Sequence, residues 1–345
     1  MIVVVPQAPS ATRPQHRHPS STPENAWLRF DRNVSRELVH RKALPEVLIA
    51  DTVQVADDEF LLGAQLPRAH TLWSDRVYPY YDPLITIEVC RQACLAVPQR
   101  YFDVGPDWQF ISKRIDFCVV NLDAFSDDEA SPAEGILRAR FSNRRERHGM
   151  LCGISVQSEL TIDGISAATV TGDLMFFPRV TYERLRAQQR KHKALDTGPL
   201  NTPRPIDPAS VGRTFPRNVT ISESKVSPAV EESRFVAIVD QRHPTFFDHP
   251  LDHVPGALLV EIYRQAAIAV ATGDTAATPA AAVITRCDVQ LSDFAELGSP
   301  VECSARVTDR SEDKPVQIAL ALHQLESQIG DAYVELGFVS IADHH

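Results

Sequence analysis

Two apolar stretches of the sequence each contain a glutamate, an arginine and a glutamine at positions i, i+3 and i+4. The two sets are Glu88, Arg91 and Gln92 in "ITIEVCRQACLAV", and Glu261, Arg264 and Gln265 in "ALLVEIYRQAAIAV". Residues three and four apart lie on the same face of a helix. Each stretch therefore predicts a polar stripe on a helix that is otherwise apolar.

The three side chains of each stripe suit acyl transfer. A carboxylate can take the proton of an attacking hydroxyl as a general base. A guanidinium can neutralise a phosphate or a developing oxyanion through paired hydrogen bonds, and an amide can orient either partner. The candidate catalytic residues are therefore Glu88, Arg91, Glu261 and Arg264. The two glutamines, at positions 92 and 265, are candidate substrate-binding residues.

An intrahelical ion pair on a solvated helix face is the alternative interpretation, and such structural pairs are common. Two features of the sequence weigh against it. The segments on both sides of each stripe are apolar, which predicts buried helices. A buried charge destabilises the fold unless it is paired or serves the protein's chemistry. The stripe also occurs twice, in contexts whose other residues differ.

The elements around the two stripes repeat in the same order. Adding 173 to a residue number moves His70 to His243 and the first stripe onto the second. Each half has a polar loop, a long apolar helix and several runs with the alternation of antiparallel strands. We therefore predict an α+β protein with two tandem repeats, each an antiparallel sheet wrapped round a long central helix.

The domain boundaries follow from composition. Residues 1–35 are rich in Pro, Ser, Thr, His and Arg and predict a disordered tail. The first repeat is expected at 36–178 and the second at 216–342. Residues 179–215 begin basic and helix-prone and then become Pro-rich, which is typical of a linker.

The segment before the second helix contains further candidate site residues. Gly256 follows Pro255 at the expected helix start, where its backbone N–H could bind a carbonyl oxygen. Pro83 stands opposite it in the first repeat and has no N–H. His249 and His253 are candidates for orienting substrate. The histidine spacings in this loop match no standard zinc pattern, so no metal is expected.

Composition excludes several classes of function. The formal net charge is −10, which disfavours nucleic acid and anionic membrane surfaces as partners. The sequence shows no signal-peptide core and no apolar run long enough to span a bilayer, so we expect a soluble cytoplasmic protein. Two basic stretches, 144–148 and 184–193, are candidate contacts for an acidic carrier protein, although solvated loops are the default interpretation.

Several motifs resemble known families. "FFDHPLDHVPGALLVE" resembles the loop-to-helix signature of hotdog acyl-thioester dehydratases, in which Pro-Gly and four apolar residues precede an acidic residue. "EVCRQA" together with "HVPGALLVEIYRQA" resembles the A-factor biosynthesis (AfsA-like) family of γ-butyrolactone and furan signal synthases. "VHRKALPEVLIAD" and "FDHPLDHVPG" are further matches to that family.

The resemblance implies a double hotdog fold and a specific acyl transfer. The implied donor is a β-ketoacyl thioester on acyl carrier protein, and the implied acceptor is the hydroxyl of dihydroxyacetone phosphate. An aldol-type ring closure would then give a phosphorylated butenolide, the precursor of a γ-butyrolactone or furan-type signal. No cofactor is implied, and the sequence is compatible with a homodimer.

Two other functions fit the same residues. A hotdog hydratase or thioesterase would keep the fold and the acyl thioester, although water needs no cation beside Glu261 to hold it. A non-catalytic protein that binds an acyl ligand and regulates another process belongs to a different class. The duplicated charged stripe disfavours that regulator, because an apolar pocket suits an acyl chain better.

Overall fold

The computed structural model of this protein describes residues 27–191, 193, 195, 203–222, 225–227, 232–273, 275–311 and 313–339. The described chain forms two compact units. The N-terminal unit contains residues 27–74 and 79–187, and the C-terminal unit contains residues 75–78 and those from 188 onward. The first 26 residues, which belong to the predicted tail, lie outside the described residues.

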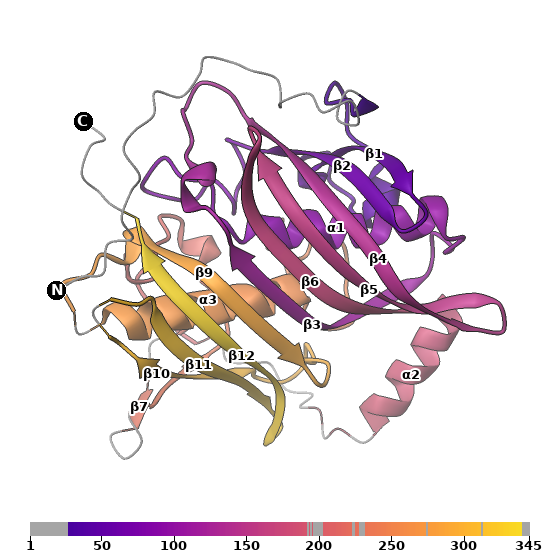
Figure 1. Ribbon diagram of the computed structural model, residues 1–345. Coiled ribbons are helices and arrows are strands. Elements are labelled where there is room, and N and C mark those ends of the chain that lie inside the picture. The colour runs from indigo at the N-terminus through magenta and orange to yellow at the C-terminus, as the bar shows by residue number, and fades with distance from the viewer. Residues whose placement is uncertain are drawn as a thin grey trace. The chain divides into compact units, whose positions relative to one another are not determined.

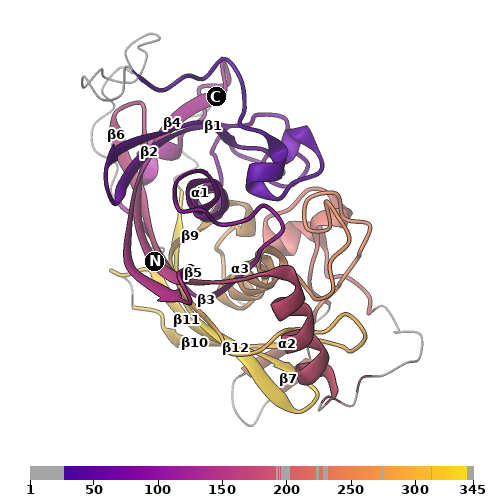
Figure 2. The ribbon, with the colours of Figure 1, turned by 90° about the vertical axis from the view of Figure 1, so that its right-hand side faces the viewer.

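The N-terminal unit is an antiparallel sheet with one long helix against it. Its strands are β1 (Ile49–Ala56), β2 (Glu59–Leu66), β3 (Gln109–Val119), β4 (Ala133–Arg147), β5 (Met150–Ile162) and β6 (Ile165–Phe177), and the spatial order is β1-β2-β4-β5-β6-β3. Helix α1 (Ile85–Tyr101) contacts five of these strands. Figure 2 views α1 nearly along its axis, with the sheet curving beside it. Short 3₁₀ turns cover Arg36–Val39, Leu44–Glu46 and Leu122–Phe125.

The C-terminal unit repeats this arrangement. Its strands are β7 (Lys225–Ser227), β8 (Glu232–Val236), β9 (Ala282–Leu291), β10 (Glu302–Asp309), β11 (Val316–Gln324) and β12 (Ser327–Phe338), in the order β9-β12-β11-β10-β8-β7. Helix α3 (Gly256–Thr272) contacts β9 to β12 (Figure 1). Further 3₁₀ turns cover Pro208–Val211, Pro216–Asn218 and Pro279–Ala281. A third helix, α2 (Arg179–Lys191), follows β6.

Tight turns set the register of the long strands. β5 and β6 are joined by Asp163 and Gly164, whose φ angles are 49° and 79°. His148 and Gly149 join β4 to β5 in the same way, with φ angles of 54° and 75°. Two successive positive φ values are the requirement of a type I′ hairpin turn, whose twist matches that of the flanking strands. The turns fix the pairing next to them, and the register then shifts by one residue near Arg145 in β4 and between Leu160 and Thr161 in β5.

The two central helices are buried almost all round, as their apolar sequences predict. In α3, Ile262, Tyr263, Ala266 and Ala267 are completely buried. Charged side chains on such a helix are shielded from bulk water. Each polar stripe therefore needs hydrogen-bond and ion-pair partners from elsewhere in its unit.

Each unit is the helix-wrapping antiparallel sheet that the sequence predicts. The packed chain begins before the predicted boundary at residue 36, because Leu28 packs with Leu61 and Ile136. Within the predicted linker, residues 179–191 form α2 and Val211 is buried. Among the described residues, no helix is both long enough and apolar enough to cross a bilayer.

Candidate functional site

Glu261 of α3 lies at the centre of a buried polar network in the C-terminal unit. Its side chain is 4% exposed. Arg213 donates to Oε1 of Glu261 from Nε at 3.0 Å and from Nη2 at 2.8 Å. Gln265 Nε2 donates to the same oxygen at 2.6 Å, and Arg264 Nη1 lies 3.4 Å from it. Oε2 of Glu261 accepts no hydrogen bond from any described residue.

Gln265 links α3 to the segment that precedes β8. It is completely buried. Its Oε1 accepts the backbone N–H of Thr220 at 2.8 Å, and its Nε2 donates to the carbonyl of Asn218 at 2.6 Å. Because Nε2 also donates to Glu261, both amide protons are used. The predicted substrate-binding glutamine therefore holds Glu261 in place.

The first stripe has the same architecture with tighter pairing. Glu88 Oε1 accepts from Arg41 Nη2 at 2.7 Å, from Arg91 Nη2 at 2.8 Å and from Gln92 Nε2 at 2.7 Å. Its Oε2 accepts from Arg91 Nε at 2.7 Å. Gln92 also bonds the carbonyl of Glu46 and the N–H of Leu48, which parallels the contacts of Gln265 in the other unit.

The pKa of Glu88 follows from this pairing. Burial favours the neutral acid and would raise the pKa, but the charges of Arg41 and Arg91 outweigh it and hold the pKa well below its usual range. A carboxylate with such a low pKa is a weak base. Both oxygens of Glu88 thus accept hydrogen bonds, whereas Oε2 of Glu261 accepts none from the described residues.

Sequence reasoning missed the arginines at positions 41 and 213. Both precede the first strand of their repeat, and a shift of 172 residues superposes Val39 and Arg41 on Val211 and Arg213. Arg213 also lies in the segment expected to be a linker. Because the stripe itself superposes with a shift of 173, the one-residue difference hid the second arginine.

Two buried histidines stand beside the networks. His243 Nδ1 accepts the backbone N–H groups of Thr245 and Phe246 at 3.3 Å each, and its Nε2 lies 3.0 Å from Asn218 Oδ1. Since Nδ1 accepts, Nε2 carries the proton and donates to that oxygen. His70 accepts similarly through Nδ1, and its Nε2 lies 3.3 Å from a Glu46 oxygen, without the geometry of a linear hydrogen bond.

The helix starts differ between the repeats. Helix α3 begins at Gly256, directly after Pro255. The N–H of Gly256 has no partner among the described residues, and a Cβ added at this position would meet nothing within 4 Å. Helix α1 begins at Ile85, after Pro83, which has no N–H to offer. Gly256 therefore presents an unpaired donor at a helix N-terminus next to open space.

The loop before α3 positions the other two candidate histidines. His253 Nδ1 lies 2.7 Å from Asp252 Oδ1, and its ring meets the ring of Phe294 edge-on at 4.8 Å. His249 Nδ1 lies 3.5 Å from Asp248 Oδ2. Both histidine side chains are about a quarter exposed, at 24% and 29%. Across the described part of the chain, no group of three or more metal-ligating residues is placed to hold a metal ion.

The basic stretch 184–193, which covers the end of α2, contacts the loop before α3. Arg190 Nε lies 3.0 Å from Glu296 Oε2, and Lys193 Nζ lies 3.2 Å from Glu296 Oε1. Glu296 is almost completely buried, at 1% exposed. Arg190 also donates to the carbonyl of Asp252. Two of the predicted carrier-contacting cations thus neutralise a buried carboxylate in the C-terminal unit.

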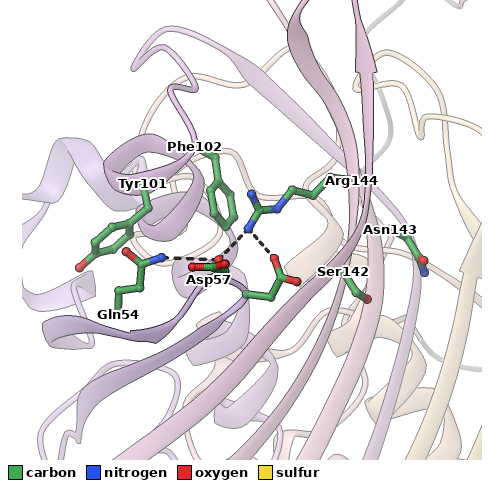
Figure 3. A pocket seen from close by; sticks show the side chains of 8 residues that line it. Gln54, Asp57, Tyr101, Phe102, Ser142, Asn143 and Arg144 are labelled. Atoms are coloured by element: carbon green, nitrogen blue, oxygen red, sulfur yellow. Dashed lines mark hydrogen bonds and ion pairs between the residues drawn. The ribbon is translucent and has the colours of Figure 1, made fainter.

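Arg144, the first residue of the other basic stretch, lines a shallow depression in the N-terminal unit. Figure 3 shows Arg144 there, with its guanidinium over the ring of Phe102 at 3.9 Å. Arg144 Nη2 donates to Asp58 Oδ1 at 2.5 Å and to the carbonyl of Asp57 at 2.8 Å. The lining contains no residue of the Glu88 network. Arg144 is therefore engaged within its own unit.

A family of known proteins matches most of this chain. The A-factor biosynthesis hotdog domain (AfsA) matches residues 23–178 and again residues 196–340. The chain belongs to the AfsA family. Its two matched segments correspond to the two helix-and-sheet units, so each unit is a hotdog fold and the protein contains two in tandem.

Relatives of this chain from two Streptomyces species share one name. A 2-oxo-3-(phosphooxy)propyl 3-oxoalkanoate synthase from Streptomyces virginiae is 32% identical over 297 residues, which cover 86% of this chain and 95% of the relative. A protein of the same name from Streptomyces coelicolor is 29% identical, over 79% of this chain and 82% of its own. Among solved structures, an inactive variant of the CurJ dehydratase is similar at a TM-score of 0.51 and 11% identity. The similarity covers 84% of this chain and 95% of that one.

Proposed function

We propose that this AfsA protein transfers a β-ketoacyl group from a thioester on an acyl carrier protein to the hydroxyl of dihydroxyacetone phosphate. The name of the Streptomyces relatives describes the resulting ester, a 3-oxoalkanoate of a phosphorylated three-carbon ketone. The observation that carries the proposal is the buried Glu261, held by Arg213 and Gln265 through one oxygen while its other oxygen accepts no hydrogen bond from the described residues.

The proposed reaction uses that oxygen as the proton acceptor. The hydroxyl oxygen attacks the thioester carbonyl carbon, a C–O bond forms and the C–S bond breaks. The hydroxyl proton passes to Oε2 of Glu261 and then to the departing sulfur, so the step needs no oxidant, reductant or cofactor. Arg213 holds the carboxylate in its orientation through the opposite oxygen.

Two further groups supply electrostatic stabilisation in this proposal. The unpaired N–H of Gly256 binds the carbonyl oxygen on which negative charge develops. Arg264 lies on the stripe one turn after Glu261, and its planar guanidinium suits a phosphate dianion. In the other repeat, Arg91 is more exposed, at 23% of its side chain, and is the corresponding candidate.

The subsequent ring closure belongs to the same proposal. The ester product carries an acidic carbon between two carbonyl groups and a ketone within reach of it. An aldol-type closure with loss of water gives the phosphorylated butenolide that precedes a γ-butyrolactone or furan-type signal. Because acyl carrier proteins supply the donor, we place the reaction in the cytoplasm.

Mass spectrometry of a reaction mixture tests the proposal. Purified protein is incubated with a β-ketoacyl thioester on acyl carrier protein and dihydroxyacetone phosphate, with dihydroxyacetone as the acceptor that lacks phosphate. We expect the mass of the phosphorylated ester or of its dehydrated ring, and much less product without the phosphate. Free β-keto acid as the only product would instead identify a thioesterase. Retention of the intact thioester without turnover would identify a binding protein.

A further inference from the structure

Asp75 comes from the first half of the sequence but belongs to the C-terminal unit. The four residues 75–78 are assigned to that unit, whereas the chain on either side of them belongs to the N-terminal unit. Asp75 is 2% exposed. A buried carboxylate is costly unless donors surround it, so the partners of Asp75 indicate what it does.

The carboxylate of Asp75 is surrounded by donors from the segment that carries Arg213. Oδ1 accepts from the backbone N–H of Thr214 at 2.8 Å and from its hydroxyl at 2.5 Å. Both carboxylate oxygens lie 3.3 Å from the backbone nitrogen of Phe215. Oδ2 accepts from Asn218 Nδ2 at 2.7 Å. These contacts span 139 to 143 residues of sequence.

Asp75 also contacts the arginine of the candidate site directly. Its backbone carbonyl accepts from Arg213 Nη1 at 3.2 Å. The other two nitrogens of that guanidinium, Nε and Nη2, donate to Glu261 Oε1. Asp75 therefore fixes Arg213 at both ends, through the guanidinium and through the backbone that follows the arginine.

A chain of directional hydrogen bonds leads from Asp75 to His243. A carboxylate only accepts, so Oδ2 of Asp75 requires the NH₂ end of the Asn218 amide to face it. The Oδ1 end of Asn218 then faces His243 and accepts from its Nε2–H. The backbone donors at Nδ1 of His243 require the same tautomer. Every donor in this chain meets an acceptor only if the residue at position 75 is an acceptor.

We propose that Asp75 is a positioning residue of the Glu261 site. It orients Arg213 and the amide of Asn218, and through that amide it provides the acceptor for the Nε2–H of His243. The statement about activity rests on the proposed function of Glu261, whereas the statement about the hydrogen-bond network does not. The site of the second repeat is therefore incomplete without a residue that precedes the first helix.

Substitution of Asp75 by asparagine tests this with little change in shape. The new amide keeps an oxygen for Thr214 and Phe215 but turns its NH₂ group toward the NH₂ group of Asn218. Rotation of Asn218 would relieve that clash only by presenting a donor to the Nε2–H of His243. We expect kcat for ester formation to fall by about 10- to 100-fold, with a smaller change in KM, since one buried donor is left unpaired.

The double variant Asp75→Asn with Asn218→Asp is the decisive arm. The pair is reversed, so the amide at position 75 donates to the carboxylate at position 218, whose second oxygen accepts from His243. The first repeat already has an acid, Glu46, at the position that corresponds to Asn218 after a shift of 172. We expect the double variant to recover most of the lost kcat. Asp331→Asn, at an exposed position of β12, is the matched control and should retain wild-type kcat.

A readout that is independent of turnover is the ring of His243. In ¹⁵N spectra of the full chain we expect an Nε2–H imidazole in the wild type, a perturbed one in Asp75→Asn, and recovery in the double variant. If no ester forms with the wild type, the proposed function fails while the spectra still test Asp75. Unchanged spectra together with wild-type kcat in Asp75→Asn would overturn the inference, as would a loss that the double variant does not recover.

Discussion

At the scale of single residues, the two glutamates of the duplicated stripe differ in what surrounds their oxygens. Both oxygens of Glu88 accept hydrogen bonds, and two arginines lower its pKa. Glu261 concentrates its bonds on Oε1. Oε2 of Glu88 accepts from Arg91, whereas Oε2 of Glu261 accepts from no described residue. We therefore propose Glu261 as the base of the duplicated motif and Glu88 as its structural counterpart.

Substituting each glutamate by glutamine separates these roles. We expect Glu261→Gln to lower kcat by about 100-fold or more, because a general base contributes about 10²–10⁴-fold. We expect Glu88→Gln to act mainly on folding, at a cost of about 3–5 kcal/mol, because it leaves buried guanidiniums without their anion. Steady-state kinetics and denaturant unfolding of both variants measure this. Equal losses of about half the activity would mean two equivalent sites and would contradict it.

The low pKa of Glu88 predicts a specific dependence of stability on pH. Its pKa in the folded protein lies below the ordinary value of 4.5, so the ionised form stabilises the fold fully above about pH 4.5. That contribution is lost as the pH falls through the folded pKa. The difference in melting temperature between wild type and Glu88→Gln should therefore be constant from pH 7 to pH 5 and shrink below pH 4.5. A difference that widens on acidification would refute the pairing.

At the scale of elements, the start of α3 offers a test of the unpaired N–H. Pro255 has ψ of 146°, a conformation that a following proline favours, and proline is well tolerated at the first helical position. Gly256→Pro should therefore fold normally but lower kcat by about 10²–10³-fold, the usual effect of losing one oxyanion donor. Gly256→Ala keeps the N–H and is the control. Comparable kcat values for the two variants would exclude a role for this donor.

The end of α2 and the loop before α3 are joined through Glu296. Removing its charge by Glu296→Gln leaves Arg190 and Lys193 with a weaker acceptor and loosens the loop that contains His253. We expect faster amide exchange over residues 248–256 and an increased KM for the thioester, with Glu302→Gln on the exposed side of β10 as control. If the faster amide exchange were confined to the termini of α2, the order of the loop would not depend on Glu296.

At the scale of the whole molecule, the sequence predicts what is periodic and misses what is long-range. Helical spacing and apolar flanks predict the buried stripes, because both are local properties of α1 and α3. The duplication predicts two sheets round two helices. Arg213 escaped because it lies in a Pro-rich segment whose packing depends on distant residues. Sequence analysis could not predict the role of Asp75 either, because the partners of its carboxylate lie at least 139 residues away and no local sequence pattern indicates such a contact.

The assignment of residues 75–78 to the C-terminal unit has a consequence for synthesis on the ribosome. Chains grow at about 5–20 residues per second, and domains usually fold as they emerge, from the N-terminus onward. Thr214 follows Asp75 by 139 residues, so the partner segment is made about 7–28 s later. During that interval the N-terminal unit can close round α1 while the Asp75 carboxylate remains in water. Asp75 can therefore gain its buried partners only after the ribosome has made the segment that contains Thr214.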